Sequence, residues 1–206
     1  MTDAATLLAA NDLACRRGER VLFRHLNFTV APGQIVWLRG ANGRGKTSLL
    51  RLLAGLAPPA TGHIARDPQR ERVYVGHANA LKDDLTVTES LRFLSRLHGF
   101  DSVPAALAMA LQRFGLASRR DAPVRTLSQG QRRRVALARL CLAPPHALWL
   151  LDEPFDALDA EGVSALNALL AEHAMRGGSV LLTSHVPLTL NSPTPITLQL
   201  DEAAAA

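Results

Sequence analysis

A short apolar run followed directly by a glycine-rich segment constrains the fold of this chain more than any other feature. The run is Ile35–Leu38, and residues 40–47 after it read Gly-Ala-Asn-Gly-Arg-Gly-Lys-Thr. Four apolar residues in succession are typical of a strand that is covered on both faces. Apolar residues then recur at helical spacing from Lys46 to Leu53. The sequence therefore predicts a strand, a glycine-rich loop and a helix in direct succession.

The glycine-rich segment matches the phosphate-binding pattern G-x-x-x-x-G-K-[ST], in the place between strand and helix that the pattern requires. Glycines let the backbone turn its N–H groups inward, where they hold phosphate oxygens at the positive end of the helix. We expect Lys46 to reach the β- and γ-phosphates of ATP and the Thr47 hydroxyl to bind Mg²⁺. A chance tight turn is the alternative, but Lys46 is one of only two lysines. The expected ATP-binding residues are Gly40, Ala41, Asn42, Gly43, Arg44, Gly45, Lys46, Thr47 and Ser48.

A second apolar run, Ala147–Leu151, ends at two carboxylates, Asp152 and Glu153. Open α/β sheets bind ligands at the carboxyl ends of their strands. We expect Asp152 to hold Mg²⁺ through water and Glu153 to orient or deprotonate the water that attacks the γ-phosphate. Adjacent side chains on an extended strand point to opposite faces, which suits the two carboxylates to different roles. Carboxylates that merely cap a strand are the alternative, and the phosphate loop in the same chain disfavours it.

Alternating strands and helices predict an α/β fold with a P-loop NTPase core and a parallel sheet. We expect an antiparallel β lobe at the start of the chain, with strands Leu7–Ala14 and Phe28–Val30 joined by the polar stretch Arg16–Arg20. A helical lobe at about 82–145 is inserted in the core, so residues 1–206 form one domain. Further strands are expected at Val73–Val75 and Ser179–Thr183, and further helical segments at 88–114, 128–142 and 162–175.

Composition excludes several classes of protein. The chain is 48% apolar and 20% charged, as in a folded domain. It has no apolar run long enough to span a membrane and no secretory leader, so we expect it to stay in the cytoplasm. Cys15 and Cys141 lie far apart outside any metal-binding motif, which favours buried free thiols. The net charge of +5 comes from scattered arginines. We expect no nucleic acid partner and interpret Arg132–Arg134 as a solvated helix face.

The segment Leu127–Gln131 reads LSQGQ and lies between the phosphate loop and the Asp152–Glu153 pair. Ser128 is a good N-cap for a following helix. In this order the motifs resemble the family of ATP-binding cassette (ABC) ATPases, whose signature is similar to LSQGQ. Gln129 stands where the family usually has glycine. The resemblance implies that a self-dimer forms on ATP binding and that the signature contacts ATP in trans through Ser128, Gln129, Gly130 and Gln131.

Further segments extend the resemblance over nearly the whole chain. Ala157-Leu158-Asp159 is similar to the D-loop of the family, which implies that Asp159 couples the two ATP sites. His185 follows a strand and resembles the switch histidine that links Glu153 and the γ-phosphate; a structural histidine is the alternative. The resemblance thus implies that Glu153 and His185 are the catalytic residues.

Two positions depart from the family pattern. Cys15-Arg16-Arg17 replaces the usual aromatic contact to adenine, and the planar guanidinium of Arg17 is the candidate substitute. His77 lies at or near the position of a glutamine that touches Mg²⁺, and it is either a metal contact or an ordinary loop histidine. The sequence alone leaves both alternatives open.

Within the ABC family, the chain most resembles the ATP-binding subunit of the haem exporter of cytochrome c maturation, the CcmA family. The resemblance implies a transport-coupled ATPase that works with separate transmembrane subunits at the cytoplasmic face of the bacterial inner membrane. By the same resemblance we expect its ATPase to serve haem export or haem release to a periplasmic chaperone, together with other haem pathway proteins. The alternatives are the ATPase subunit of another ABC transporter, for a lipid, peptide or ion, and a soluble ABC ATPase without a transport role.

Overall fold

The computed structural model describes residues 6–100, 103–190 and 192–200, and the chain divides into two compact units. Unit 1 comprises Met1–Tyr74, Pro145–Glu153 and Ala171–Ala206; unit 2 comprises Val75–Pro144 and Pro154–Leu170. The chain therefore passes between the units at four points, after Tyr74, Pro144, Glu153 and Leu170. The single domain with an inserted lobe at about 82–145 stays a prediction.

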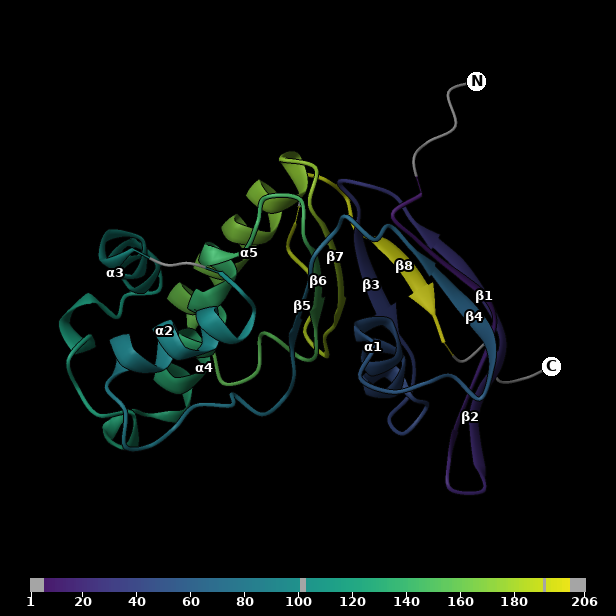
Figure 1. Cartoon of the computed structure of the whole chain (residues 1–206), viewed down its shortest axis with the longest axis horizontal. Helices are drawn as coiled ribbons and strands as arrows, with labels where there is room; N and C mark the ends of the chain where they lie inside the picture. Colours follow the sequence, from purple (N-terminus) through teal and green to yellow (C-terminus); the bar gives the residue numbers. More distant parts are fainter. Residues whose placement is uncertain (1–5, 101–102, 191, 201–206) are drawn as a thin grey trace. The chain divides into compact units, whose positions relative to one another are not determined.

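Two sheets form the framework of unit 1 (Figure 1). The antiparallel sheet has the order β2-β1-β4, and the other sheet has the order β5-β6-β7-β3-β8, in which β6, β7, β3 and β8 are parallel neighbours. The strands are β1 (Leu8–Arg17), β2 (Arg20–Val30), β3 (Ile35–Arg39), β4 (Thr61–Arg66), β5 (Arg72–Val75), β6 (Leu148–Leu151), β7 (Ser179–Thr183) and β8 (Ile196–Gln199).

Helix α1 (Lys46–Ala54) joins the two sheets through one hydrophobic core. Its four leucines, Leu49, Leu50, Leu52 and Leu53, are all buried. They belong to the same cluster as Leu13 and Phe23 of the antiparallel sheet and Leu38, Leu150 and Leu181 of the parallel sheet. This burial fixes the helix that follows the glycine-rich loop, because apolar area removed from water is the main stabilising contribution.

The β1–β2 hairpin is longer than the sequence predicted. Within the polar stretch Arg16–Arg20 only Gly18 and Glu19 form the connection, because β1 continues to Arg17 and β2 begins at Arg20. Its arginines are exposed, so alternation of apolar and polar residues gives no signal there. Strands β4 and β8 were not predicted. Neither has a buried residue, so their sequences lack the alternation of apolar and polar residues that indicates a strand.

Unit 2 is helical. It contains α2 (Val87–Leu97), α3 (Pro104–Arg113), α4 (Gln129–Ala138) and the first part of α5 (Ala160–Met175), with 3₁₀ turns at Ala117–Arg119, Val124–Thr126 and Arg139–Leu142. Pro104 begins α3 as predicted. Helix α4 ends earlier than predicted, at Ala138, and the chain continues as a 3₁₀ turn. Helices α2, α3 and α4 pack against one another.

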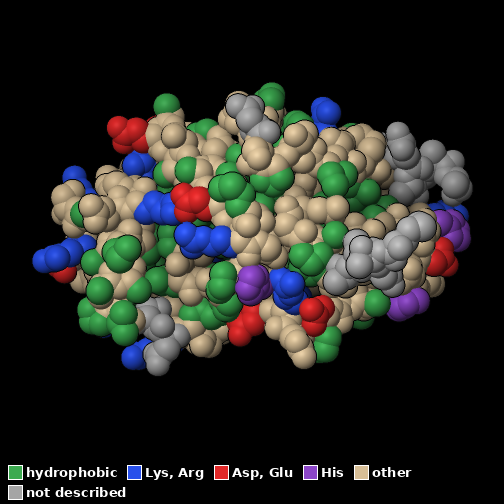
Figure 2. All heavy atoms as spheres, turned by 90° about the horizontal axis from the view of Figure 1, so that it is seen from above, with side chains coloured by type: hydrophobic (Ala, Val, Ile, Leu, Met, Phe, Trp, Pro, Cys, Tyr) green, Lys and Arg blue, Asp and Glu red, His purple; other side chains and the backbone are tan. Residues whose placement is uncertain are grey.

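Some expectations from composition can be compared with the structure. Both cysteines are free, with Cys15 buried and Cys141 half-buried. Among the described residues, no helix is both long enough and apolar enough to cross a membrane. On the face shown in Figure 2, basic side chains are interspersed with acidic and uncharged ones.

Candidate active site

The glycine-rich loop runs from the end of β3 to the start of α1, and its conformation requires glycine at Gly45. This residue has φ of +99° and lies at the N-cap of α1. A β-carbon there would lie 3.0 Å from Leu22 Cβ and 3.2 Å from Phe23 Cδ1. Both the left-handed backbone and the close approach of β2 therefore disfavour any side chain. The antiparallel sheet thus helps to shape the loop.

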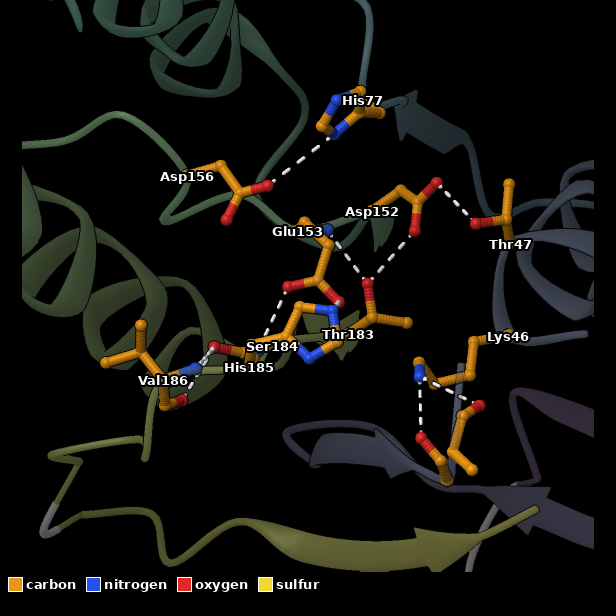
Figure 3. A network of polar contacts seen from close by, with 12 residues as sticks. Lys46, Thr47, His77, Asp152, Glu153, Asp156, Thr183, Ser184, His185 and Val186 are labelled. Carbon is orange, nitrogen blue, oxygen red and sulfur yellow. Dashed lines mark hydrogen bonds and ion pairs between the residues drawn. The ribbon is translucent and has the colours of Figure 1, made fainter. Parts of the chain in front are cut away.

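Lys46 begins α1, and its ammonium group lies over the loop. Its Nζ donates hydrogen bonds to the carbonyl of Gly40 at 2.6 Å and to that of Ala41 at 3.3 Å (Figure 3). A lysine ammonium is a compact point charge on a flexible stem. It can therefore turn from these carbonyls to a phosphate of a nucleotide held by the same loop.

Thr47, Asp152 and Thr183 form a hydrogen-bonded chain across the carboxyl ends of β6 and β7 (Figure 3). Thr47 Oγ1 donates to Asp152 Oδ2 at 2.9 Å, and Thr183 Oγ1 donates to Asp152 Oδ1 at 3.0 Å. Asp152 is only 3% exposed. Burial and the nearby negative charge of Asp152 raise the pKa of the Tyr74 phenol. Asp152 is therefore a buried carboxylate that is fixed at both oxygens.

Glu153 does not lie on an extended strand, contrary to the prediction. Strand β6 ends at Leu151, and Glu153 has φ of +47°, a left-handed conformation that is uncommon for a residue with a side chain. In this conformation the Glu153 N–H donates to Thr183 Oγ1 at 2.8 Å, on the separate strand β7. Thr183 thus orients both carboxylate residues. The two side chains have different partners, and their separate roles stay a prediction.

The side chain of Glu153 is held by His185. Glu153 Oε2 accepts a hydrogen bond from the His185 backbone N–H at 3.0 Å, and Oε1 lies 3.5 Å from His185 Nε2. The Glu153 side chain is 13% exposed and that of His185 is 59% exposed. The pairing of Glu153 with His185 that the resemblance implied is therefore present in the geometry.

A pocket of about 270 Å³ opens beside Lys46 and His185. Trp37 forms part of its wall, and the Trp37 Nε1–H donates to the Ser184 carbonyl at 3.2 Å. The Arg39 guanidinium lies 4.6 Å from the centre of the Trp37 ring. The lining residues are Trp37, Leu38, Arg39, Gly40, Lys46, Ser184, His185, Pro187 and Gln199. The pocket therefore places a lysine, an arginine and a histidine around one space, which suits an anion.

In unit 2, the LSQGQ segment forms the N-terminus of α4. Ser128 is the N-cap as predicted: its Oγ accepts from the Gln131 N–H at 3.2 Å, and Gln131 Oε1 accepts from the Ser128 N–H at 3.0 Å. Ser128 and Gln129 are exposed. A β-carbon on Gly130 would lie 2.7 Å from the Ala157 carbonyl oxygen, so only glycine permits this approach. Exposed polar groups and helix N–H groups thus lie at one helix end.

The interpretation of Arg132–Arg134 as a solvated helix face was wrong for two of the three residues. Arg133 is 3% exposed and Arg134 is 8% exposed. Arg134 bonds to the Phe114 carbonyl and to the Asp159 carboxylate. Arg132, with 24% of its side chain exposed, pairs with Asp83 at 2.7 Å. The physical reason is that carbonyl and carboxylate acceptors from distant parts of the chain satisfy the buried guanidinium groups.

Asp159 has a structural role that the sequence reasoning missed. Its Oδ1 accepts from Arg134 and from the Gly162 N–H, near the start of α5. The hydrogen bond from Arg134, followed by that from Gly162, lowers the pKa of the Asp159 carboxyl group. The aspartate just before the first residue of a helix is a common cap and was readable from sequence. Its coupling role stays a prediction.

The structure places the two remaining predicted residues without testing their roles. Arg17 is exposed at the end of β1 and lies opposite Arg20 of β2 in the antiparallel ladder. Near it, burial raises the pKa of the Cys15 thiol, which a hydrogen bond to Ser48 partly offsets. The His77 side chain is 76% exposed, and its Nδ1 lies 3.6 Å from Asp156 Oδ2 within unit 2 (Figure 3). Contacts to adenine and to Mg²⁺ stay predictions.

Comparisons with known proteins agree with these motifs. The family described as ABC transporter matches residues 23–156. The cytochrome c biogenesis ATP-binding export protein CcmA of Aromatoleum aromaticum is 48% identical, with 100% of both chains covered. The protein of the same name from Pseudomonas syringae pv. syringae is 47% identical over 90% of this chain and 91% of that protein.

A solved structure supports the fold independently. An ABC transporter ATP-binding protein of Pyrococcus furiosus superposes with a TM-score of 0.83 at 23% identity, covering 96% of this chain and 98% of that one. The predicted α/β fold, with its parallel sheet, antiparallel sheet and helices, is confirmed. The chain therefore belongs to the ABC transporter family of ATP-binding proteins and, within it, to the group of CcmA-like cytochrome c biogenesis ATP-binding export proteins.

Proposed function

We propose that the chain is the ATP-hydrolysing subunit of an ABC export complex that serves haem delivery in cytochrome c biogenesis. The observation that carries this proposal is the network at the carboxyl ends of β6 and β7, in which Thr183 fixes Asp152 and Glu153 and His185 holds the Glu153 carboxylate. The names of the similar proteins supply the pathway.

The glycine-rich loop and Lys46 bind the phosphates of ATP. The loop presents N–H groups at the N-terminus of α1, where the helix dipole favours negative charge. Lys46 exchanges its bonds to the Gly40 and Ala41 carbonyls for bonds to phosphate oxygens. The charges of Lys46 and of the helix end stabilise the negative charge that shifts toward the leaving phosphate in the transition state.

Thr47 and Asp152 fit a magnesium ion by the chemistry of their donors. Thr47 Oγ1 and Asp152 Oδ2 lie 2.9 Å apart, and hydroxyl and carboxylate oxygens are the ligands that Mg²⁺ prefers. When bound, Mg²⁺ neutralises charge on the β- and γ-phosphate oxygens. Thr183 keeps Asp152 oriented through its second oxygen.

Glu153 is the general base in this mechanism. Its carboxylate accepts the proton of the attacking water, while its backbone is held by Thr183 and its side chain by His185. Such anchoring matters because a base accelerates the reaction only when it is held in the right geometry. His185 lines the same pocket as Lys46, where it can contact the γ-phosphate.

Unit 2 supplies the signature in trans to a second copy of the chain. The signature residues Ser128, Gln129, Gly130 and Gln131 form the N-cap and first turn of α4, with Ser128 and Gln129 exposed, and the N–H groups and helix dipole there attract an anion. A γ-phosphate bound by another subunit is such an anion. We therefore propose that ATP binding joins two copies, with Asp159 coupling their sites and Arg17 and His77 as contacts to adenine and Mg²⁺.

The partners of this ATPase are separate transmembrane subunits and haem pathway proteins. We place the chain at the cytoplasmic face of the bacterial inner membrane, because ATP is available there. In this arrangement residues 1–206 act as one ATPase domain, and hydrolysis drives haem export or haem release toward the periplasm.

Haem staining of c-type cytochromes in a strain that lacks the gene tests the proposal. The native chain should restore mature cytochromes, and a chain with Lys46→Ala should not. Glu19→Gln, on the hairpin turn, is the matched control and should restore them. Staining that persists in the deletion strain would overturn the haem pathway role, and restoration by Lys46→Ala would overturn the requirement for ATP. A deletion strain with normal cytochromes but a defect in the transport of a lipid, a peptide or an ion would instead indicate that the chain belongs to another ABC transporter.

A further inference from the structure

Arg133, on the second turn of α4, is a buried cation with bonds to two separate chain segments. Its Nη1 donates to the Gly76 carbonyl at 2.9 Å and to Asn79 Oδ1 at 3.2 Å, and its Nε donates to the Pro154 carbonyl at 3.3 Å. Arg133 is 3% exposed. A guanidinium group presents donors in a rigid planar fork, so a single side chain can hold both segments at once.

The two segments are the connections through which the chain enters unit 2. Gly76 comes two residues after the passage at Tyr74, and Pro154 comes directly after the passage at Glu153. The first connection leads into His77, and the second leaves the proposed catalytic base. One side chain on α4, the helix that Ser128 caps, therefore fixes both of these connections within unit 2.

The buried positive charge of Arg133 makes a second positive charge nearby less favourable. Arg139, 5% exposed on the following 3₁₀ turn, has its pKa lowered to about 10 by burial and then by the positive charge of Arg133. Apolar residues of similar volume are often at least as stabilising as buried charges. What an apolar side chain cannot do is donate to the carbonyls of Gly76 and Pro154 together. The geometry therefore favours a positioning role.

We propose that Arg133 is a positioning residue that makes the signature helix, the His77 segment and the chain leaving Glu153 move as one body. This inference rests on the proposed function. When the start of α4 engages a nucleotide in trans, Arg133 carries the displacement to Gly76 and Pro154. ATP binding by the phosphate loop does not involve Arg133, so the proposal concerns turnover rather than affinity.

Hydrogen exchange of the full-length chain without nucleotide is the first test. Arg133→Met should speed exchange at residues 76–79 and 155–157 together by about fivefold, because carbonyl bonds in both segments are lost. Exchange in α2 and α3 should be unchanged. Arg96→Met, an exposed arginine on α2, is the matched control and should change neither segment. Faster exchange throughout unit 2 would indicate a general stabilising role and would overturn the proposal.

The second test separates positioning from fold. In membranes that contain the complete transporter, Arg133→Met should lower the kcat of ATP hydrolysis about 10-fold or more while the KM for ATP stays within about twofold. Arg133→Lys should not restore kcat, because an ammonium group cannot bond to both segments in the same way. A kcat within twofold of native, or a loss of ATP affinity equal to the loss of kcat, would overturn the proposal.

A milder variant covers the case in which Arg133→Met does not fold. Asn79→Ala removes only the hydrogen bond from Arg133 Nη1 to Asn79 Oδ1 and leaves the bond to the Gly76 carbonyl. It should speed exchange at residues 76–79 by about twofold and lower kcat about threefold. Unchanged exchange and kcat in this variant would count against the proposal. The exchange experiment contains no nucleotide and so does not depend on ATP hydrolysis. If Arg133→Met speeds exchange in both segments but the native chain does not hydrolyse ATP, the proposed function is refuted and the positioning role of Arg133 within unit 2 is not.

Discussion

The two units bury basic side chains in opposite ways. In unit 1, His173 is 6% exposed, stacks on Trp149 at a centroid distance of 3.6 Å and donates from Nε2 to the Ala147 carbonyl. Burial is the main cause that lowers its pKa to about 4, so the ring is uncharged at neutral pH. Unit 2 instead buries the guanidinium groups of Arg133, Arg134 and Arg139. Arg139, with its pKa of about 10, is still charged at neutral pH.

This difference shows how each unit holds its functional groups. In unit 1 the side chains of Thr47, Asp152 and Thr183 bond to one another. In unit 2 the buried cations bond to backbone carbonyls and to Asp159 and so fix the course of the chain. We therefore expect substitutions in unit 1 to lower the rate of hydrolysis directly. Substitutions in unit 2 should lower it by displacing chain segments.

Glu153→Gln should give the largest effect, because it removes the base and keeps the shape. We expect kcat for ATP hydrolysis to fall about 10³-fold, within the usual range for general base catalysis, with ATP binding retained and a closed ATP-bound dimer accumulating. Steady-state hydrolysis and size-exclusion chromatography with ATP measure both results. Glu161→Gln, a carboxylate with 89% of its side chain exposed, is the control. Hydrolysis at the native rate in Glu153→Gln would refute the role of Glu153.

Acidification should destabilise unit 1 through His173. The folded-state pKa of about 4 lies below the ordinary value of 6.5, so the unfolded chain binds the proton first. The contribution is complete above pH 6.5 and is lost as pH falls toward 4, by about 3 kcal/mol in all. Urea unfolding followed by hydrogen exchange should show this loss at residues 147–151 and 179–183.

His173→Phe is the matched variant for this prediction, since it keeps the stacking on Trp149 but cannot titrate. Its unfolding free energy should vary less between pH 6.5 and 4 than that of the native chain. In unit 2, burial and the positive charge of Arg139 lower the pKa of His98 in the same direction, but its ring is half-buried. Earlier loss of protection in unit 2 than in unit 1 would contradict the comparison.

Thr183→Val should have an intermediate effect in unit 1. Valine has nearly the same shape but loses the bond to Asp152 and the bond from the Glu153 N–H. We expect a loss of about 2 kcal/mol in unfolding free energy, since two bonded groups lose a partner, and a lower kcat. Thr126→Val, which removes one exposed bond to the Pro123 carbonyl, is the control. Equal losses in the two variants would show that the network is not special.

Ser128 provides the smallest and sharpest contrast, in unit 2. Ser128→Ala removes the N-cap of α4 and should cost about 1 kcal/mol of unfolding free energy. Ser128→Asp supplies an equally good cap and should restore the unfolding free energy, but its negative charge opposes a γ-phosphate in trans. Thermal unfolding and ATP hydrolysis distinguish these effects. Full hydrolysis by Ser128→Asp would contradict the trans role.

The parts of the site that the sequence predicted are those fixed by short motifs. The loop at residues 40–47, the position of the carboxylates after β6 and the cap at Ser128 are each indicated by a run of a few neighbouring residues. Burial of Arg133 and Arg134 could not be predicted, because their acceptors come from Gly76, Pro154 and Asp159, far along the chain. The backbone of Glu153 was missed because it depends on Thr183, which lies on another strand.

The two tryptophans of the chain occupy different surroundings in unit 1. Trp149, 1% exposed against His173, should emit at short wavelength, as an indole does away from water. Trp37, half-buried beside Lys46 and His185 in the pocket, should emit at longer wavelength. Emission at long wavelength should therefore change when a nucleotide binds beside Trp37, and emission at short wavelength should change when the core around Trp149 unfolds.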